Sequence, residues 1–221
     1  MYGYVKVGSA VPKLRVADCV YNKEEILKLV EAAAAKQVRV LSFPELSVTG
    51  YTCADLFFQT PLLHAAEQAI QEIAEATKAL NIFLLIGAPI AVDNQMFNCA
   101  VALYKGKLLG IVPKTHIPNY SEFYEERWFA SADDLLTEEI TYAGQNVPIG
   151  ADLIFAAADF PALKIGVEIC EDLWVPIPPS SYLSLYGATL LLNLSASNEL
   201  ASKPGYRRQL VSQQSARCLS A

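Results

Sequence analysis

The sequence predicts a layered α/β fold in which helices cover the outer faces of mixed β-sheets. Short apolar runs rich in valine, isoleucine and leucine alternate along the chain with longer segments of helical periodicity. Some of these runs follow one another closely enough to form hairpins, so antiparallel pairs are expected as well. With 221 residues, 53% of them hydrophobic, the chain is long enough to bury one substantial core. We therefore expect one domain over residues 1–221.

The first elements are a strand within residues 4–12, a helix over 22–37 and a buried strand over 38–46. Asn22 and Glu25 are spaced as an N-capping pair for the helix. One face of this helix is apolar and carries Ile26, Leu29, Val30 and Ala33.

A second helix is predicted to begin with Thr60 as its cap and Pro61 at its first position, and to end near Asn81. Its apolar face is periodic and carries Leu63, Ala66, Ile70, Ile73 and Leu80. The run at residues 82–90 is apolar throughout, which is typical of a buried strand.

Two hairpins are expected next. Residues 97–114 divide into two strands around the Lys105-Gly106 turn, and residues 152–170 form a second pair with Pro161 in the turn. Residues 114–150 lack strong periodicity, and so long a stretch in a compact domain is usually a binding loop or lid.

The last elements are a short helix over 178–187, a buried strand over 188–197 and a helix over 205–221. Apolar residues of this last helix are Leu210, Val211 and Leu219. Because no glycine cap or polar tail follows it, we expect a domain truncated at its C-terminus.

Composition argues against several classes of function. The net charge of −6 gives no basic face for nucleic acid or anionic lipid. No apolar run approaches the roughly 18 residues that cross a bilayer, and residues 1–10 lack a leader pattern. The five cysteines are far apart and form no C-x-x-C motif, so neither a disulfide framework nor a metal site is indicated. We expect a cytoplasmic protein with reduced thiols.

Three polar residues share one context, because Glu45, Lys114 and Cys170 each lie at or just past the end of an apolar strand. In layered α/β folds such ends place reactive groups on a rigid frame. Carboxylates around Cys170 would raise its pKa, so a lysine that favours the thiolate and a carboxylate that accepts the thiol proton are both needed.

These three groups are sufficient for the hydrolysis of an amide. Cys170 would attack the carbonyl carbon, and Glu45 would carry the thiol proton to the leaving ammonia. Lys114 and a backbone N–H after Cys170 would stabilise the oxyanion. Water would then cleave the thioester with Glu45 as the base.

Two other interpretations remain open at this point. Each of the three residues taken alone is also compatible with a structural or solvated role. A papain-like pair would need His64 or His116 as the base for Cys170, but His64 lies in an amphipathic helical pattern and no orienting Asn or Asp accompanies His116.

Three segments carry a family resemblance, in order and over essentially the whole chain. They are "FPELSVTGY" at 43–51, "VPKTHIPNYSEFYEERWF" at 112–129 and "GVEICEDLWVP" at 166–176. They resemble the signature segments of the nitrilase superfamily, the carbon-nitrogen hydrolases. The resemblance places that superfamily's Glu–Lys–Cys triad on the same glutamate, lysine and cysteine, and implies an α-β-β-α sandwich that pairs in oligomers.

Within that superfamily, the closest resemblance is to the N-terminal glutaminase domains of glutamine-dependent NAD+ synthetases. It is carried by "LSVTGYTCADLF" at 46–57, "PNYSEFYEERWF" at 118–129, "CEDLWVPIPPS" at 170–180 and "NLSAS" at 193–197. It implies that L-glutamine is the substrate, and that ammonia passes through a tunnel to a synthetase domain that amidates deamido-NAD. ATP and Mg2+ would serve that domain, whose phosphate-loop motif this chain lacks, and the glutaminase step would need no cofactor.

The resemblance also assigns the substrate contacts. Glu171 would hold the ammonium of glutamine, with Tyr120 nearby, and Ser197 and Lys203 would hold its carboxylate. Family members often have arginine at the position of Lys203, and lysine lacks the bidentate fork of arginine. A site selective for a zwitterion needs an acid and a base away from the triad, which fits this assignment.

Further residues near these motifs receive supporting roles. Glu125 matches the acid that lies beside the catalytic lysine in the family and would orient Lys114. Tyr51 is compatible with the pocket lining or with the core. Glu168 and Asp172 are interpreted as structural.

Two other functions compete with a glutaminase domain that feeds a synthetase. A stand-alone nitrilase-type ω-amidase would act on another small amide, and a non-catalytic assembly protein would retain the same fold. Preference for an amide without an ammonium group would favour the ω-amidase.

Overall fold

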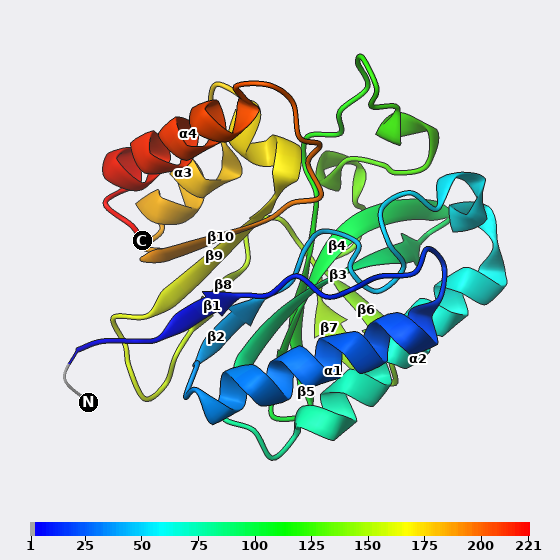
Figure 1. The fold of residues 1–221 in the computed structure, drawn as a ribbon, viewed down its shortest axis with the longest axis horizontal. Helices are drawn as coiled ribbons and strands as arrows, with labels where there is room; N and C mark the ends of the chain where they lie inside the picture. The colour runs from blue at the N-terminus through cyan, green and yellow to red at the C-terminus, as the bar shows by residue number, and fades with distance from the viewer. Residues whose placement is uncertain (1–2) are drawn as a thin grey trace.

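The computed structural model describes residues 3–221 and has two β-sheets packed face to face, each covered by helices on its outer side (Figure 1). Residues 1–2 lie outside the described residues. They belong to residues 1–10, for which no leader pattern was expected. The larger sheet has the order β1-β2-β3-β4-β5, with β1 to β3 parallel and β3 to β5 antiparallel. Its strands are β1 (Val7–Ser9), β2 (Val40–Ser42), β3 (Phe83–Val92), β4 (Gln95–Tyr104) and β5 (Lys107–Pro113).

The smaller sheet has the order β10-β9-β8. Its strands are β8 (Ile154–Ala156), β9 (Lys164–Ile169) and β10 (Leu190–Leu194). β8 and β9 form the predicted antiparallel hairpin, and β10 runs parallel to β9 after the α3 crossover. The ends of β9 and β10 therefore lie at the same edge of the sheet.

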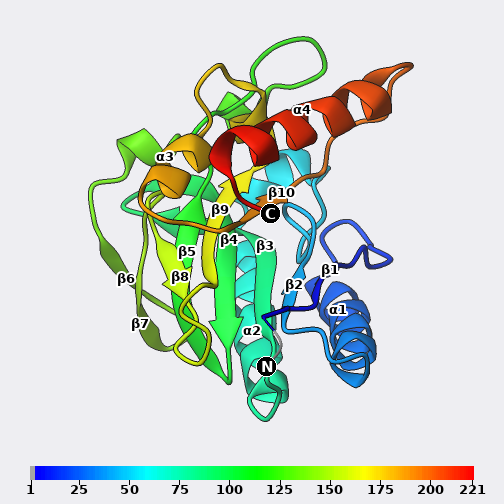
Figure 2. The same cartoon turned by 90° about the vertical axis from the view of Figure 1, so that its left-hand side faces the viewer.

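Within residues 3–221, four α-helices complete the α-β-β-α sandwich, which confirms the fold expected from the family resemblance. α1 (Cys19–Ala35) and α2 (Thr60–Thr77) cover the larger sheet, while α3 (Pro179–Leu185) and α4 (Lys203–Cys218) cover the smaller one (Figures 1 and 2). The connections contain the short 3-10 helices η1 (Ala54–Phe58), η2 (Glu125–Arg127), η3 (Ala132–Asp134) and η4 (Cys170–Trp174).

Strand β3 shows how the alternation of side chains builds two apolar layers. Leu84 and Ile86 point into the core formed with α1 and α2, whereas Phe83 and Leu85 pack into the core between the two sheets. All four side chains are buried, and each contributes about 1.5–3 kcal/mol of transfer free energy. The strand is apolar on both faces because both of its faces are covered.

The start of α1 corrects one expectation. Asp18, not Asn22, caps the helix by accepting a hydrogen bond from the N–H of Tyr21 at 3.0 Å. Asn22 is buried inside the first turn, and its side-chain amide bonds the backbone of Arg15 and the carbonyl of Val48. The Asn22 and Glu25 spacing was therefore misread, because Asn22 ties the loop before the helix to the larger sheet.

The bounds of two other helices also differ from expectation. α2 has Gln59 rather than Thr60 at its N-cap position and ends at Thr77, before Asn81. α4 begins at Lys203 and ends at Cys218, and the apolar Leu219 that follows it has 91% of its surface accessible. Some apolar residues of the C-terminal segment are therefore exposed to solvent and do not lie on the side that packs against the protein.

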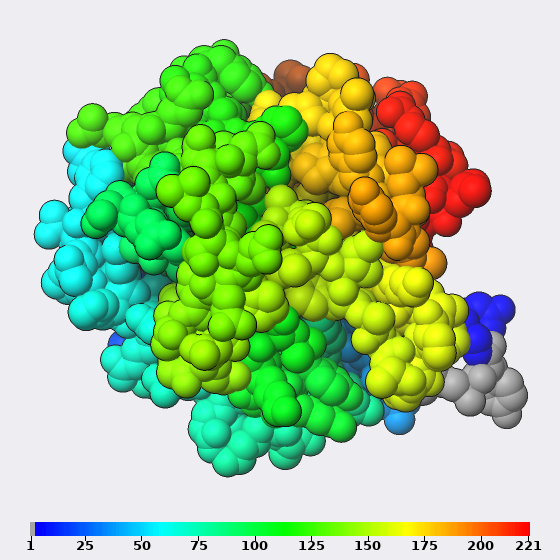
Figure 3. Space-filling view, turned by 180° about the vertical axis from the view of Figure 1, so that it is seen from behind, coloured from blue at the N-terminus to red at the C-terminus, as the bar shows by residue number. Residues whose placement is uncertain are grey.

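The stretch expected to be irregular, residues 114–150, contains an additional hairpin. Strands β6 (Glu139–Tyr142) and β7 (Gln145–Pro148) pair through a tight turn in which Ala143 and Gly144 both have positive φ. Figure 3 shows this segment, in yellow-green, on the face opposite to that of Figure 1. The strands are too short for a strong period-2 signal.

Three structural findings bear on the function. Within residues 3–221, no helix is both long enough and apolar enough to cross a bilayer. The same residues contain no grouping of His, Cys, Asp and Glu side chains with the geometry of a metal site. All five cysteines are free thiols.

Candidate active site

Glu45 lies in a tight turn that follows β2 and packs directly on β3. A Cβ atom on Gly87 of β3 would lie 2.6 Å from the carbonyl oxygen of Pro44 and 2.8 Å from the carbonyl carbon of Glu45. The N–H of Val48 donates to the carbonyl of Gly87 at 3.1 Å. Glycine in this buried strand is therefore required for the close approach that places Glu45.

Lys114 follows β5 directly, and its side chain is fully buried. Its Nζ donates to Glu45 Oε1 at 2.8 Å and to both carboxylate oxygens of Glu125 at 2.9 and 2.8 Å. Burial alone would lower the pKa of Lys114, but the two carboxylates hold it above its ordinary value. The lysine is therefore a permanent cation shared between two buried acids.

Glu125 comes from η2 in the long connection and completes this charge cluster. Burial raises the pKa of Glu125, while Lys114 opposes that shift. The hydroxyl of Tyr51 donates to Glu125 Oε1 at 2.6 Å, and burial together with Glu125 raises the pKa of this tyrosine. Tyr51 is half-buried, and its hydrogen bond supports Glu125, the acid that binds Lys114.

Cys170 is the first residue of η4, directly after β9, and has φ of +46°. A positive φ is uncommon for a non-glycine residue and costs about 1–3 kcal/mol, so the surroundings must hold it. The carboxylate of Asp172 does so by accepting the N–H of Ile169 at 2.9 Å and that of His116 at 2.7 Å. Burial raises the pKa of Asp172 to about 7.

The thiol of Cys170 is neutral at neutral pH. Burial and the charge of Glu45 raise its pKa to about 12, although Lys114 and a hydrogen bond from Ser195 act in the opposite direction. Lys114 favours the thiolate, as expected, but burial and the charge of Glu45 outweigh its influence on the pKa of Cys170. A base must take the proton during attack on a substrate.

Three contacts at this site were missed in the sequence. Ser195 Oγ, just past β10, donates to Cys170 Sγ at 3.4 Å, and the N–H of Ala196 donates to Glu45 Oε2 at 3.0 Å. Asn98 Nδ2 donates to Glu45 Oε1 at 2.7 Å. An available signal was Asn98, the one polar residue in the apolar run 96–103, since such a residue must have a buried partner.

The residues expected to bind substrate line one cavity of about 420 Å³ that also reaches Cys170. The hydroxyl of Tyr120 donates to Glu171 Oε1 at 2.9 Å, so the acid is oriented. Ser197 and Lys203 line the same cavity. Lys203 bonds the side chain of Asn198 and lies above two aromatic rings, 5.3 Å from the centroid of Trp174 and 5.7 Å from that of Phe123.

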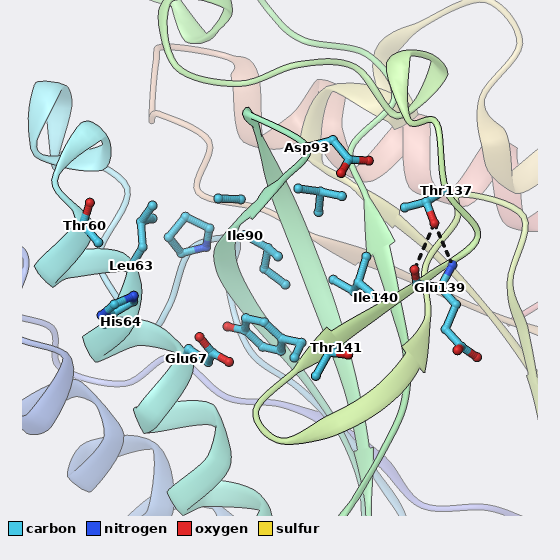
Figure 4. A pocket seen from close by; sticks show the side chains of 14 residues that line it. Thr60, Leu63, His64, Glu67, Ile90, Asp93, Thr137, Glu139, Ile140 and Thr141 are labelled. Carbon is cyan, nitrogen blue, oxygen red and sulfur yellow. Dashed lines mark hydrogen bonds between the residues drawn. The ribbon is translucent and has the colours of Figure 1, made fainter.

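The two histidines do not take the place of Glu45. His64 lines a separate cavity of about 540 Å³ between α2 and the β6–β7 hairpin, together with Glu67 and Glu139 (Figure 4). Neither Cys170 nor any residue of the charge cluster lines this cavity. His116 donates its backbone N–H to Asp172 and lines a groove that does not include Cys170. The geometry does not support a papain-like pair.

Comparison with known proteins gives one family and several close relatives. The carbon-nitrogen hydrolase family matches residues 7–221. The glutamine-dependent NAD(+) synthetase of Mycobacterium tuberculosis is 38% identical over 220 residues, and that of Mycobacterium leprae is 39% identical over 219. These matches take in 100% and 99% of this chain but 32% of each relative, so the chain spans about a third of their length.

Solved structures agree with these matches. A glutamine-dependent NAD(+) synthetase from Cytophaga hutchinsonii superposes with a TM-score of 0.85 and 30% identity, over 97% of this chain and 34% of that one. An amidase from Nesterenkonia sp. superposes with a TM-score of 0.76 over 100% of this chain and 75% of that one. At 17% identity, this second likeness concerns the fold alone.

Proposed function

Because the chain belongs to the carbon-nitrogen hydrolase family, we propose that it is the glutaminase domain of a glutamine-dependent NAD+ synthetase. One observation carries the proposal. The buried Lys114 ammonium binds Glu45, and the segment after β10 joins Glu45 to the sulfur of Cys170, so an acid, a cation and a thiol are linked, and the thiol lines the cavity of about 420 Å³.

In the first half of the reaction, a thioester forms and ammonia leaves. Glu45 accepts the thiol proton while Cys170 Sγ attacks the side-chain carbonyl carbon of glutamine. Lys114 stabilises the negative charge that develops on the carbonyl oxygen, with a backbone N–H after Cys170 as the second donor. Glu45 then gives its proton to the leaving nitrogen, and the C–N bond breaks.

In the second half, water restores the enzyme. Glu45 accepts a proton from a water molecule that attacks the thioester carbon, the C–S bond breaks, and the proton returns to the sulfur. The products are glutamate and the free thiol. Glu125 and Tyr51 hold Lys114 in place through both halves, because each donor and acceptor in this cluster is paired.

The cavity has the charges that a free amino acid requires. Glu171, adjacent to Cys170, would bind the ammonium group with its carboxylate held by Tyr120. Lys203 and Ser197 would bind the carboxylate group. A small amide without these charges would supply no opposite charge to Glu171 or Lys203, which disfavours it.

The partners follow from the same proposal. A synthetase domain outside these residues would use the ammonia to amidate deamido-NAD and would need ATP and Mg2+, whereas the glutaminase step uses the side chains described above without a cofactor. We further propose a cytoplasmic homo-oligomer. The exposed apolar side chains of Leu185, the last residue of α3, and of Tyr186, which follows it, support an assembly through this layer.

The decisive experiment compares two amides under steady-state conditions. Ammonia release from L-glutamine should exceed that from 2-oxoglutaramate, which has the same reacting amide but no ammonium group for Glu171. The reverse preference would replace the proposal with an ω-amidase. No release from either amide would remove the hydrolytic function altogether.

A further inference from the structure

The segment that follows β10 contacts both reacting groups of the site, although neither the family resemblance nor the comparisons assign Ser195 a role. Ser195 Oγ lies 3.4 Å from Cys170 Sγ, and the next residue, Ala196, donates its N–H to Glu45 Oε2. Asn193, two residues before Ser195, donates from its Nδ2 to the carbonyl oxygen of Cys170 at 3.3 Å. The end of β10 and the residues just after it therefore contact the sulfur of Cys170, its backbone carbonyl and the carboxylate of Glu45.

A second contact agrees with the direction of the Ser195 hydrogen bond. The N–H of Ser197 donates to Ser195 Oγ at 3.3 Å, which uses a lone pair of that oxygen. The hydroxyl hydrogen is then free to point toward the sulfur. Ser195 is thus oriented as a donor to Cys170 in the absence of substrate.

We propose that Ser195 is a further catalytic residue, whose hydroxyl donates to Cys170 Sγ and stabilises the negative charge that develops there when Glu45 removes the thiol proton. The inference rests on the proposed function. The proton passes from sulfur to Glu45, Ser195 keeps its own proton, and no bond to Ser195 forms or breaks.

The charges around the sulfur explain why such a donor is needed. The buried cluster contains two acids, Glu45 and Glu125, and one cation, Lys114, so its field opposes a thiolate. A hydrogen bond to a charged acceptor is about twice as strong as one to a neutral acceptor. The Ser195 contact therefore strengthens as the sulfur becomes charged, which lowers the barrier rather than merely stabilising the resting state. The downward influence of Ser195 on the pKa of Cys170 agrees with this.

The test is the rate at which iodoacetamide alkylates Cys170 between pH 6 and 10, followed by peptide mass spectrometry in the intact protein. Below the pKa of the thiol, this rate rises with the thiolate fraction. Ser195→Ala should move the whole profile to higher pH by about one unit, which is roughly a tenfold lower rate at each pH. Ser195→Thr, which keeps the hydroxyl, should restore the wild-type rate to within about threefold of its value.

Cys218 provides an internal control, because this half-buried thiol lies in the same chain and its alkylation should not change. Ser212→Ala, an exposed position on α4, is the matched variant. Ser195→Gly also removes the hydroxyl and replaces the alanine variant if that variant fails to fold. An unchanged Cys170 profile in the hydroxyl-free variant, or an equal loss in Ser195→Thr, would overturn the proposal. Since alkylation needs no glutamine, the result is independent of whether the wild-type protein releases ammonia.

Discussion

The buried charge cluster and the rim of the proposed substrate cavity are built differently, although both consist of charged and phenolic groups. In the cluster, Glu45, Lys114 and Glu125 each have 2% or less of their surface exposed, and several hydrogen bonds hold each one. At the rim, Tyr120 is 54% exposed, and its contact with Glu171 is one hydrogen bond on the surface.

This difference indicates a division between chemistry and selectivity. Buried charges in a low dielectric interact strongly and are costly to leave unpaired, so the fold must position them before any substrate arrives. Exposed charges are screened by water and become strong partners only when a ligand covers them. Substitutions in the cluster should therefore affect stability and the rate of the chemical step, whereas substitutions at the rim should affect substrate binding.

The largest effect on stability is expected at Lys114. Lys114→Met removes the cation and leaves two buried carboxylates without compensation, which should cost about 3–5 kcal/mol of unfolding free energy. Urea unfolding measures the loss, with Lys107→Met at the exposed start of β5 as the matched control. The double variant Lys114→Met/Glu125→Gln should recover part of it. If Lys114→Met and Lys107→Met were equally stable, the cluster would not be a coupled unit.

The largest effect on rate alone is expected at Glu45. Glu45→Gln keeps the shape of the side chain but removes the base, so kcat for ammonia release should fall about 10²–10⁴-fold. His116→Ala should retain substantial activity, because that side chain lines a different groove. Equal losses in the two variants would show that the base is misassigned.

A smaller effect is expected at Gly87, which touches no substrate. Gly87→Ala would drive its Cβ into the turn that carries Glu45, and an overpacked contact of this kind costs about 1–3 kcal/mol. Both the melting temperature and kcat should fall. Gly205→Ala is the matched control, since nothing lies within 4 Å of that Cβ and alanine is the better helix former. An unchanged kcat in Gly87→Ala would show that this glycine does not help to position Glu45.

The smallest effect is expected at the rim. Lys203→Ala should raise KM for glutamine by about tenfold, which corresponds to about 1.4 kcal/mol, and leave kcat within a few-fold. With butanamide, which has no carboxylate, KM should be the same in the variant and the wild-type protein. A rise in KM for both amides would mean that Lys203 shapes the cavity instead of binding the carboxylate.

The sequence alone singled out three residues that follow apolar strands and left a structural role open for each. Strand ends gather at one edge of a sheet, so Glu45, Lys114 and Cys170 could be expected near one another once the strands were recognised. The layered fold was predicted for the same reason, from the length and spacing of the apolar runs. The family resemblance added the specific sandwich, Glu125 and the residues of the rim.

The sequence could not reveal contacts that depend on which strands become neighbours. Asn98 reaches Glu45 because β4 lies beside β3, and Ser195 reaches Cys170 because β10 pairs with β9 in parallel. Neither pairing follows from local periodicity. The net effect on the pKa of Cys170 was also out of reach, since it depends on how deeply the thiol is buried and on Lys114 being shared by two acids.

The most direct test of the central claim is the site of covalent labelling by a thiol-reactive glutamine analogue, such as a diazo-ketone of norleucine. Such an analogue must fit the zwitterion site and then react with the nucleophile beside Glu45 and Lys114. We predict one adduct per chain, located by peptide mass spectrometry on Cys170 and prevented by excess L-glutamine. Labelling of another cysteine, or no labelling of Cys170 by the analogue, would contradict the account.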